Sequence, residues 1–563
     1  MCDEDRASRL LGIDMPDVGK ASATYDGDVL TATAEERATP FSNHPGSPRD
    51  TTSPASPSPP LPGSWWVLKL SIGAQGRQLL GTTAESGDSS RRNMAFDLRN
   101  VRTTGGAATL RAASGTVWSG NEKVGWNVAE STDAVVVGAG VIGSSIALEL
   151  VRSGLRVVVV DKFGGAGNGS TSASSAVVRF TYPTIAGVSA AWESRHCWEA
   201  WRDHLQAPAS EPLAAFNRCG VTMLDVDFAP CGMFTRHFDK VGVPYEKWGA
   251  RELSKRLPAV DTGRYFPPRP VDDDEFFADA SARLGALHTP DGGFVDDPQL
   301  AAHNLATAAQ RHGAAFRWKT PVTAVMRRGG RVRGVRLKDG TELSAGVVVN
   351  AAGPWSGQLN RLAEVGGDFT VGLRPLRREV HHVAAPAGYH DAGGDGHAPV
   401  LADMDLGTYI RPEGREFLLV GGTEPECDPL EWLDDPDDGS PTPTVSQFRT
   451  QVTRAARRLP GLRVPNKPRG VAGVYDVTDD WTPVYDRTEL AGFYVAIGTS
   501  GNQFKNAPLV GRLMTTLIHG VEGGHDHDRS ALTHTCEHTD QTIDLGAFSR
   551  RRRPAPSTGT VLG

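Results

Sequence analysis

The sequence predicts an α/β fold in which a dinucleotide-binding domain, built from separated stretches of the chain, carries an inserted domain of mixed and antiparallel β-sheet. Three observations predict it. A glycine-rich turn joins an apolar strand to a helix near residue 138. Blocks of short alternating strands with hairpin turns interrupt the strands and helices that follow. With 563 residues, the chain is also too long for a single hydrophobic core.

The glycine-rich turn indicates a Rossmann-like unit. A strand expected at Ala134–Val137 leads into GAGVIG, a helical pattern follows, and a second apolar strand ends at Asp161. Gly138 permits the tight turn, Gly140 lets the backbone approach a pyrophosphate, and Gly143 lets the helix pack closely on the strand. The helix N-terminus offers unpaired N–H groups to phosphates, and an acid about 20 positions on binds ribose hydroxyls. The sequence therefore predicts a bound dinucleotide.

Composition narrows the class of protein. Hydrophobic residues make up 39% of the chain and charged residues 22%, as is typical of a soluble globular protein. The net charge of −7 gives no reason to expect binding to nucleic acid or an anionic membrane. The six cysteines form no CxxC pair, and no apolar run is long enough to span a bilayer. The acidic start MCDEDRASRL lacks the order of a signal peptide, so we expect a cytoplasmic protein.

Composition also divides the chain. Residues 1–130 are rich in Ser, Thr, Gly, Ala and Pro, and we expect them to be disordered. Residues 521–563 are interpreted as a polar tail whose arginines 550–553 are solvated, and the histidines there match no familiar closed metal site, so no metal is expected. The predicted pieces of the two folded domains are 131–212, 285–370 and 465–520 for dinucleotide binding, and 213–284 and 371–464 for the insertion.

Local signals place several elements between these limits. Asp297 and Pro298 form an N-cap and first turn, and they begin a helix that we expect to end near residue 311. Strands are expected at 321–327, 332–337 and 342–350, joined by Gly-Gly and Asp-Gly hairpin turns. The sequence AAGPWSG follows, and GTSGNQFKNAPLVGRLMTTLI contains the last expected helix.

Four motifs, in this order, resemble the D-amino-acid oxidase/sarcosine oxidase superfamily of FAD-dependent oxidoreductases: VVVGAGVIGSSIALEL, STSASSAVVRFTY, VVVNAAGPWS and GTSGNQFKNAPLVG. The resemblance covers about residues 131–520 and implies FAD as the cofactor. It also implies that residues 351–355 lie near the adenylate end and that residues 498–504 lie over the flavin ring. The residues expected to contact FAD are Gly138, Gly140, Val141, Ile142, Gly143, Asp161, Lys162, Ser170, Thr171, Ser172, Val322, Ala352, Gly353, Trp355, Gly498, Ser500, Gly501, Asn502, Gln503 and Phe504.

The resemblance also implies a substrate site. Arg179 in VVRFTY and Lys505 in NQFKNAP match positions that hold a substrate carboxylate in the sarcosine-oxidase branch. An arginine presents a planar fork to a carboxylate, and a lysine adds a mobile charge. Tyr409, at the start of a hairpin, is a third catalytic candidate. The implied reaction oxidises an N-methyl or secondary amino acid, such as sarcosine or dimethylglycine, to an imine by hydride transfer to flavin N5.

Two departures from the family pattern affect these expectations. Gly473 stands where sarcosine oxidases attach FAD through a cysteine, so we expect non-covalent FAD. Leu419 aligns with a lysine that activates oxygen, which leaves either O2 or an electron-acceptor protein as the oxidant. Two other functions stay open. One is an FAD-dependent 2-hydroxy-acid or glycerol-phosphate dehydrogenase, and the other is a non-catalytic flavoprotein that serves as an assembly or regulatory subunit.

Overall fold

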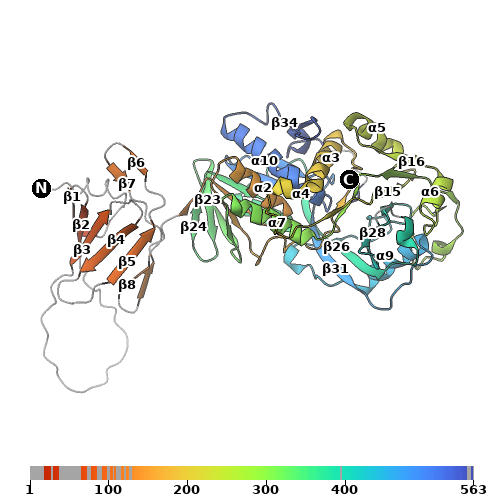
Figure 1. Ribbon diagram of the computed structural model, residues 1–563, viewed down its shortest axis with the longest axis horizontal. Coiled ribbons are helices and arrows are strands. Elements are labelled where there is room, and N and C mark those ends of the chain that lie inside the picture. Colours follow the sequence, from red (N-terminus) through yellow and green to blue (C-terminus); the bar gives the residue numbers. More distant parts are fainter. Residues whose placement is uncertain are drawn as a thin grey trace, which may run out of the picture. The chain divides into compact units, whose positions relative to one another are not determined.

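The chain forms two compact units, Met1–Glu130 and Ser131–Gly563. The structure, a computed structural model, describes residues 131–391, 396–554 and 559–561 with their side chains (Figure 1). It also describes the backbone of residue 392 and of the strands that precede residue 131.

The first unit contains an antiparallel sheet in the order β1-β2-β3-β4-β5 and two further hairpins, β6-β7 and β8-β9. Strands therefore occur where disorder was expected, and alternating segments such as VLTATAEE are the pattern that favours them. The rest of residues 1–130 lies outside the described residues, and there the expectation stays a prediction. The strands are β1 (Val18–Asp26), β2 (Val29–Glu36), β3 (Trp65–Ile72), β4 (Gln78–Ala84), β5 (Arg92–Asp97), β6 (Arg102–Thr104), β7 (Ala107–Thr109), β8 (Thr116–Ser119) and β9 (Glu122–Gly125).

A mainly parallel sheet in the order β21-β12-β11-β25-β33-β32 lies at the centre of the second unit, and β32 alone in it runs antiparallel to its neighbour. Its central strands are runs of buried valines, as expected for a sheet covered on both faces. Helix α2 packs against both α7 and α10. The elements are β11 (Ala134–Val137), β12 (Val157–Val160), β21 (Ala315–Arg317), β25 (Val347–Asn350), β32 (Val484–Arg487), β33 (Phe493–Ile497), α2 (Val141–Arg152), α7 (Pro298–Arg311) and α10 (Ala507–Glu522).

A second, larger sheet has the order β16-β19-β15-β27-β28-β29-β26-β30, with β31 also paired to β26. It is mixed, because β15 runs parallel to β27 and antiparallel to β19. Helix α9 (Val445–Arg458) packs on this sheet. The strands are β15 (Val221–Leu224), β16 (Glu246–Trp248), β19 (Ala286–Thr289), β26 (Leu373–Ala384), β27 (Val400–Asp403), β28 (Thr408–Glu413), β29 (Phe417–Gly422), β30 (Glu431–Trp432) and β31 (Gly470–Thr478).

The mixed α/β fold is as predicted, but the limits of the pieces differ. Strands β19 and β31 belong to the larger sheet, although the sequence analysis assigns both to the dinucleotide-binding pieces. Short strands with strong local turn signals do not reveal which distant strand they pair with, because pairing is a tertiary choice.

Smaller elements confirm the local signals. The Asp297 carboxylate caps α7 by accepting a hydrogen bond from the N–H of Leu300 at 2.8 Å. Gly329-Gly330 and Asp339-Gly340 join β22 (Val322–Arg328), β23 (Arg331–Leu337) and β24 (Glu342–Ser344) as two hairpins. The other elements are β10 (Glu130–Ser131), β13 (Val177–Val178), β14 (Phe216–Asn217), β17 (Gly263–Arg264), β18 (Ala282–Arg283), β20 (Gly293–Val295), α3 (Ile185–Glu199), α4 (Trp201–Leu205), α5 (Cys231–Val241), α6 (Ala250–Arg256) and α8 (Ser356–Ala363).

The segment after residue 520 is not the polar tail that the sequence analysis expects. It forms a hairpin of β34 (Thr533–Thr535) and β35 (Thr542–Asp544), and its apolar residues Leu545 and Phe548 are buried in the main core. These apolar side chains sit among many polar ones, which is why composition obscures them.

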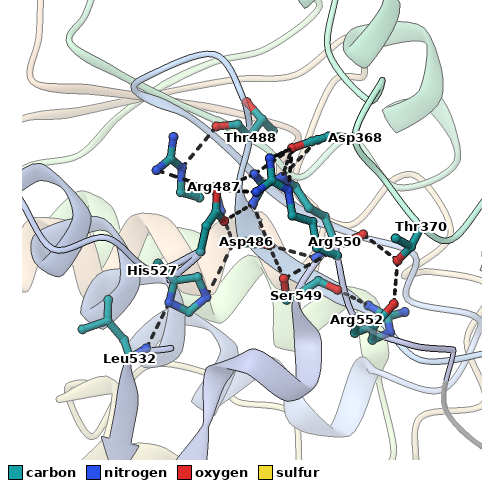
Figure 2. A network of polar contacts seen from close by, with 12 residues as sticks. Asp368, Thr370, Asp486, Arg487, Thr488, His527, Leu532, Ser549, Arg550 and Arg552 are labelled. Carbon is teal, nitrogen blue, oxygen red and sulfur yellow. Dashed lines mark hydrogen bonds and ion pairs between the residues drawn. The ribbon is translucent and has the colours of Figure 1, made fainter. Parts of the chain in front are cut away.

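Arg550 corrects the expectation of solvated arginines. Its side chain is fully buried and forms ion pairs with Asp368 at 2.8 Å, Asp486 at 3.1 Å and Asp528 at 2.6 Å (Figure 2). Arg552 is also buried, and its guanidinium pairs with Asp480 at 2.8 Å. Carboxylates from distant parts of the chain neutralise both charges, and this offsets the free-energy cost of burying them.

The buried position of Arg550 predicts a large loss of stability when its charge is removed. Arg550→Met should lower the free energy of unfolding by about 3–5 kcal/mol, because three carboxylates lose the buried cation that they share. Arg551 pairs with two of the same carboxylates, but 49% of its side chain is exposed. Arg551→Met should therefore cost less than about 1 kcal/mol. Urea unfolding followed by circular dichroism measures both, and equal losses would contradict the assigned role of Arg550.

Candidate active site

A cavity of about 410 Å³ opens where β11, β12 and β25 end; we call it the dinucleotide cavity. Most of the residues expected to contact FAD line it. They are Gly138, Gly140, Val141, Ile142, Asp161, Lys162, Ser170, Thr171, Val322, Ala352, Gly353, Trp355, Gly501, Gln503 and Phe504. The structure does not place Gly143, Ser172, Gly498, Ser500 or Asn502 in its wall.

The glycines of the first turn have separate reasons to be glycine. Gly138 has a φ of +106°, and a Cβ on it would lie 2.3 Å from the carbonyl oxygen of Ala351. A Cβ on Gly143 would lie 1.9 Å from the carbonyl oxygen of Gly138, so this residue permits helix packing and does not reach the cavity. Gly140 has more room, since its Cβ would lie 3.2 Å from Thr171 Oγ1. The contacts of Gly138 and Gly143 are those that the tight turn and the close helix packing of the motif require, and the approach of Gly140 to a pyrophosphate stays a prediction.

The N-terminus of α2 and Asp161 form the polar part of this wall. The first turn of α2 holds no acidic side chain, and its partial positive charge favours an anion such as a pyrophosphate. The Asp161 carboxylate accepts hydrogen bonds from the N–H groups of Ala139 at 2.6 Å and Phe163 at 2.7 Å. Burial raises the pKa of Asp161. Each oxygen retains a second lone pair that can accept from a ribose hydroxyl.

Asp437 is a residue of this cavity that sequence reasoning missed. It lies in the 3-10 helix Pro436–Asp438, and its carboxylate accepts from Trp355 Nε1 at 2.9 Å and from Lys162 Nζ at 2.5 Å. The ammonium of Lys162 also lies 4.0 Å from the centre of the Trp355 ring. A separation of 275 residues between Asp437 and Lys162 leaves no local signal for this contact.

The loop before α10 packs against β31. Ser500 has a φ of +48°, and its N–H donates to the carbonyl of Asp476 at 2.9 Å. A Cβ on Gly501 would lie 2.3 Å from the Tyr475 ring, so only glycine permits this close approach. Gly498 and Ser500 thus shape the loop from behind the cavity wall, while Gly501 and Phe504 face the cavity.

A second cavity of about 60 Å³ adjoins the first, because Ser174, Tyr475, Gly501 and Phe504 line both. The three predicted catalytic residues, together with Asn502, lie in its wall: Arg179, Tyr409 and Lys505. The sequence analysis thus named three residues, far apart in the chain, that the fold brings to one cavity.

The two cations of the second cavity have polar neighbours but no acidic partner. Arg179 donates from Nη2 to the carbonyl of Val561 at 2.6 Å and contacts Thr181 through Nη1. Lys505 Nζ donates to Tyr182 Oη at 2.9 Å and to the carbonyl of Asn502 at 2.7 Å. Both side chains are buried, and among the described residues neither forms an ion pair with a carboxylate. Burial, and secondly the charge of Arg179, hold the pKa of Lys505 well below its ordinary value.

Tyr409 completes this wall as a neutral phenol. Its hydroxyl lies 2.7 Å from Ser175 Oγ, and its ring packs on Gly421 in the neighbouring strand. Burial raises its pKa, so the hydroxyl keeps its proton at neutral pH. The second cavity therefore combines two cations with a hydroxyl donor.

Three further observations concern covalent attachment of the cofactor, metal binding and membrane spanning. A Cβ on Gly473 would lie 2.7 Å from the Cβ of Ala173, so the structure leaves no room for a cysteine side chain at this position without a shift. Among the described residues, no group of three His, Cys, Asp or Glu side chains is arranged to hold a metal ion. In the same part of the chain, no helix has the length and apolar character needed to cross a bilayer.

The close approach at Gly138 predicts the effect of adding one methyl group. Gly138→Ala should abolish retention of FAD, because the new Cβ collides with Ala351 and the positive φ is strained. Gly154→Ala is the matched control: it also has a positive φ, of +94°, but nothing lies within 4 Å. This control should keep its FAD and lose about 1 kcal/mol of stability. Flavin absorbance per mole of purified protein measures retention, and a Gly138→Ala protein with full flavin content would refute the assignment.

Comparisons with known proteins agree with this geometry. The family model DAO, described as FAD dependent oxidoreductase, matches residues 133–517. Glycine oxidase of Geobacillus kaustophilus is 26% identical over 414 residues, which cover 71% of this chain and 96% of that protein. Glycerol-3-phosphate dehydrogenase of Mycobacterium leprae is 30% identical over 260 residues, 43% of this chain and 40% of that protein.

The solved structure of L-proline dehydrogenase from P. horikoshii has a similar fold, with a TM-score of 0.57 at 23% identity over 71% of this chain and 95% of that one. The family model covers well over half of the chain, and the glycine turn and the acid after β12 line one cavity. This chain belongs to the DAO family of FAD-dependent oxidoreductases.

Proposed function

We propose that the enzyme oxidises an amine that carries a carboxylate, such as an N-methyl or other secondary amino acid, to an imine. The observation that supports this most is the pair of buried cations, Arg179 and Lys505, which lack an acidic partner among the described residues and line a cavity next to the dinucleotide cavity. Buried charges are costly unless they are paired. A substrate carboxylate supplies the missing negative charge.

The proposal assigns a role to each sheet. The parallel sheet is taken as a Rossmann-like FAD-binding domain, with Gly138, Gly140 and the α2 N-terminus at the pyrophosphate and Asp161 at the ribose. Lys162 and Trp355 then lie at the adenylate end, and the loop 498–504 lies at the flavin ring. The larger mixed sheet supplies Tyr409 and serves as the substrate domain. FAD binds without a covalent bond.

The chain's own residues orient the substrate. Arg179 and Lys505 hold its carboxylate, and the shared wall of Tyr475, Gly501 and Phe504 places the amine-bearing carbon beside the dinucleotide cavity. Bound FAD would supply the hydride acceptor for this carbon, the amine nitrogen would release a proton to water, and water would then hydrolyse the imine. The burial of Arg179, Lys505 and Phe504 limits the access of water to the carbon during transfer.

The relatives support this substrate class and leave the oxidant open. One is named a glycine oxidase and another an L-proline dehydrogenase, and both names specify an amino acid. The same two names differ in the kind of acceptor, so O2 and an electron-acceptor protein both remain candidates here. A cytoplasmic location is likewise part of the proposal.

A second candidate is a glycerol-phosphate or 2-hydroxy-acid dehydrogenase. The match to the Mycobacterium leprae glycerol-3-phosphate dehydrogenase favours it, and an Arg–Lys pair can also bind a phosphate. Anaerobic incubation separates the two, because only an oxidised substrate bleaches the flavin. Bleaching by glycerol phosphate, and not by any carboxylated amine, would replace the first proposal by the second.

Substitution of Arg179 tests whether this residue binds the substrate carboxylate. Arg179→Met should raise KM for a carboxylated amine about 10- to 100-fold, which corresponds to about 1.5–3 kcal/mol for hydrogen bonds to a charged group. The oxidation of an amine without a carboxylate, however slow, should be unchanged. Steady-state kinetics with the two substrates measures the difference, and an equal effect on both would remove Arg179 from the carboxylate site.

The lowered pKa of Lys505 predicts that the binding of a carboxylate depends on pH. Its ammonium is protonated below the pKa of the folded protein and loses its charge as the pH rises through that lowered pKa. Affinity for isobutyrate, a carboxylate without an amine, should therefore fall as the pH rises through this lowered pKa, at pH values where an ordinary lysine stays charged. Lys505→Arg keeps a permanent charge and should flatten the profile. Flavin absorbance titrations at several pH values measure this affinity, and identical profiles would contradict the proposed role.

A further inference from the structure

The segment of residues 559–561 reaches the second cavity, although it is distant in sequence from Arg179, Tyr409 and Lys505. Val561 is buried and lies in the cavity wall with Arg179, Tyr409 and Lys505. Its neighbour Thr560 is buried as well. A peptide segment therefore occupies part of the space beside Arg179 and Lys505.

The backbone of Val561 makes two contacts with charged side chains. Its carbonyl oxygen accepts a hydrogen bond from Arg179 Nη2 at 2.6 Å, and its N–H donates to Glu424 Oε2 at 2.7 Å. One residue thus joins a guanidinium to a carboxylate through its N–Cα–C=O unit. An α-amino acid has the same chain of atoms, with an ammonium in place of the N–H and a carboxylate in place of the carbonyl.

Glu424 combines an unusual backbone conformation with a charged partner. Its side chain is buried, its φ is +53°, and its other oxygen, Oε1, pairs with Arg378 at 2.9 Å. Non-glycine residues in this backbone region cost free energy and concentrate at functional sites. Arg378 holds one oxygen, which leaves Oε2 to accept the hydrogen bond from the N–H of Val561, a residue of the cavity wall.

We propose that residues 559–561 act as an internal pseudosubstrate, in which Val561 uses the sites of an α-amino acid: Arg179 for the carboxylate and Glu424 for the amine. The segment and the substrate then compete, and Glu424 is the residue that selects an amine. This inference rests on the proposed function in taking Arg179 as the carboxylate ligand. It goes further by naming the amine ligand and the competitor.

The test uses α-aminoisobutyrate, which has the amine and the carboxylate but no hydrogen on the carbon between them and so cannot be oxidised there. Its Kd is measured on the holoenzyme by the change in flavin absorbance, and on the FAD-free protein by calorimetry. A chain that ends at Pro554 should bind it at least about tenfold more tightly than the full chain, because the competitor is gone.

A full-length variant covers the case in which the shortened chain fails to fold. Val561→Pro lacks the N–H that Glu424 accepts, so it should also bind α-aminoisobutyrate more tightly, by about three- to tenfold. Val561→Ala keeps the N–H and should give a smaller gain than the proline variant. Wild-type Kd values in both the shortened chain and Val561→Pro would overturn the competition.

Glu424→Gln separates amine recognition from a merely structural role. It should weaken α-aminoisobutyrate about tenfold and leave isobutyrate, which has no amine, within about twofold, since the amide keeps an acceptor but loses the charge. Equal weakening of both ligands would remove Glu424 as the amine ligand. Tighter binding by the shortened chain without oxidation of any carboxylated amine would refute the proposed function alone. Oxidation with unchanged Kd values would refute this inference alone.

Discussion

The close approach of two backbones, at Gly138 and Ala351, is the constraint on which the rest of the site depends. The parallel pairing of β11 with β25 brings both turns to the same edge of the sheet, and the missing Cβ of Gly138 lets them touch. This contact fixes the direction of the α2 N-terminus and the position of Trp355, which contacts Lys162 and Asp437. Since these groups form the walls of the dinucleotide cavity, one backbone contact determines its shape.

The surroundings of the buried arginines distinguish those that stabilise the fold from the one that is proposed to bind a ligand. Arg550 is surrounded by three carboxylates of the chain, and Arg458 in the larger sheet's helix likewise pairs with Asp403 at 2.7 Å and Asp405 at 2.8 Å. Arg179 is also buried, but its acceptors among the described residues are neutral oxygens. Since desolvation is costly for all three, the one without a counter-charge is the one suited to an anionic ligand. Burial alone would not have distinguished them.

The sequence predicted those features that depend on local geometry or on a motif. The glycine turn, the Asp297 cap, the hairpins around β23 and the three residues of the second cavity are of this kind. It failed where a residue's environment comes from distant segments. Nothing near Arg550 reveals Asp368 or Asp486, and nothing near Asp437 reveals Lys162. Composition also masked the apolar residues of the last hairpin, so a packed segment was taken for a tail.

That error bears on the second cavity, because Val561 of the same segment lies in its wall. Arg550 and Arg552 fix the chain against Asp486 and Asp480, and about ten residues later Val561 contacts both Arg179 and Glu424. A solvated tail would occupy the cavity rarely, since confining it costs conformational entropy. A chain already held by buried ion pairs loses less entropy on entering the cavity, and its effective concentration there is higher. The arginines that stabilise the fold therefore also favour the position of Val561 beside Arg179 in the second cavity.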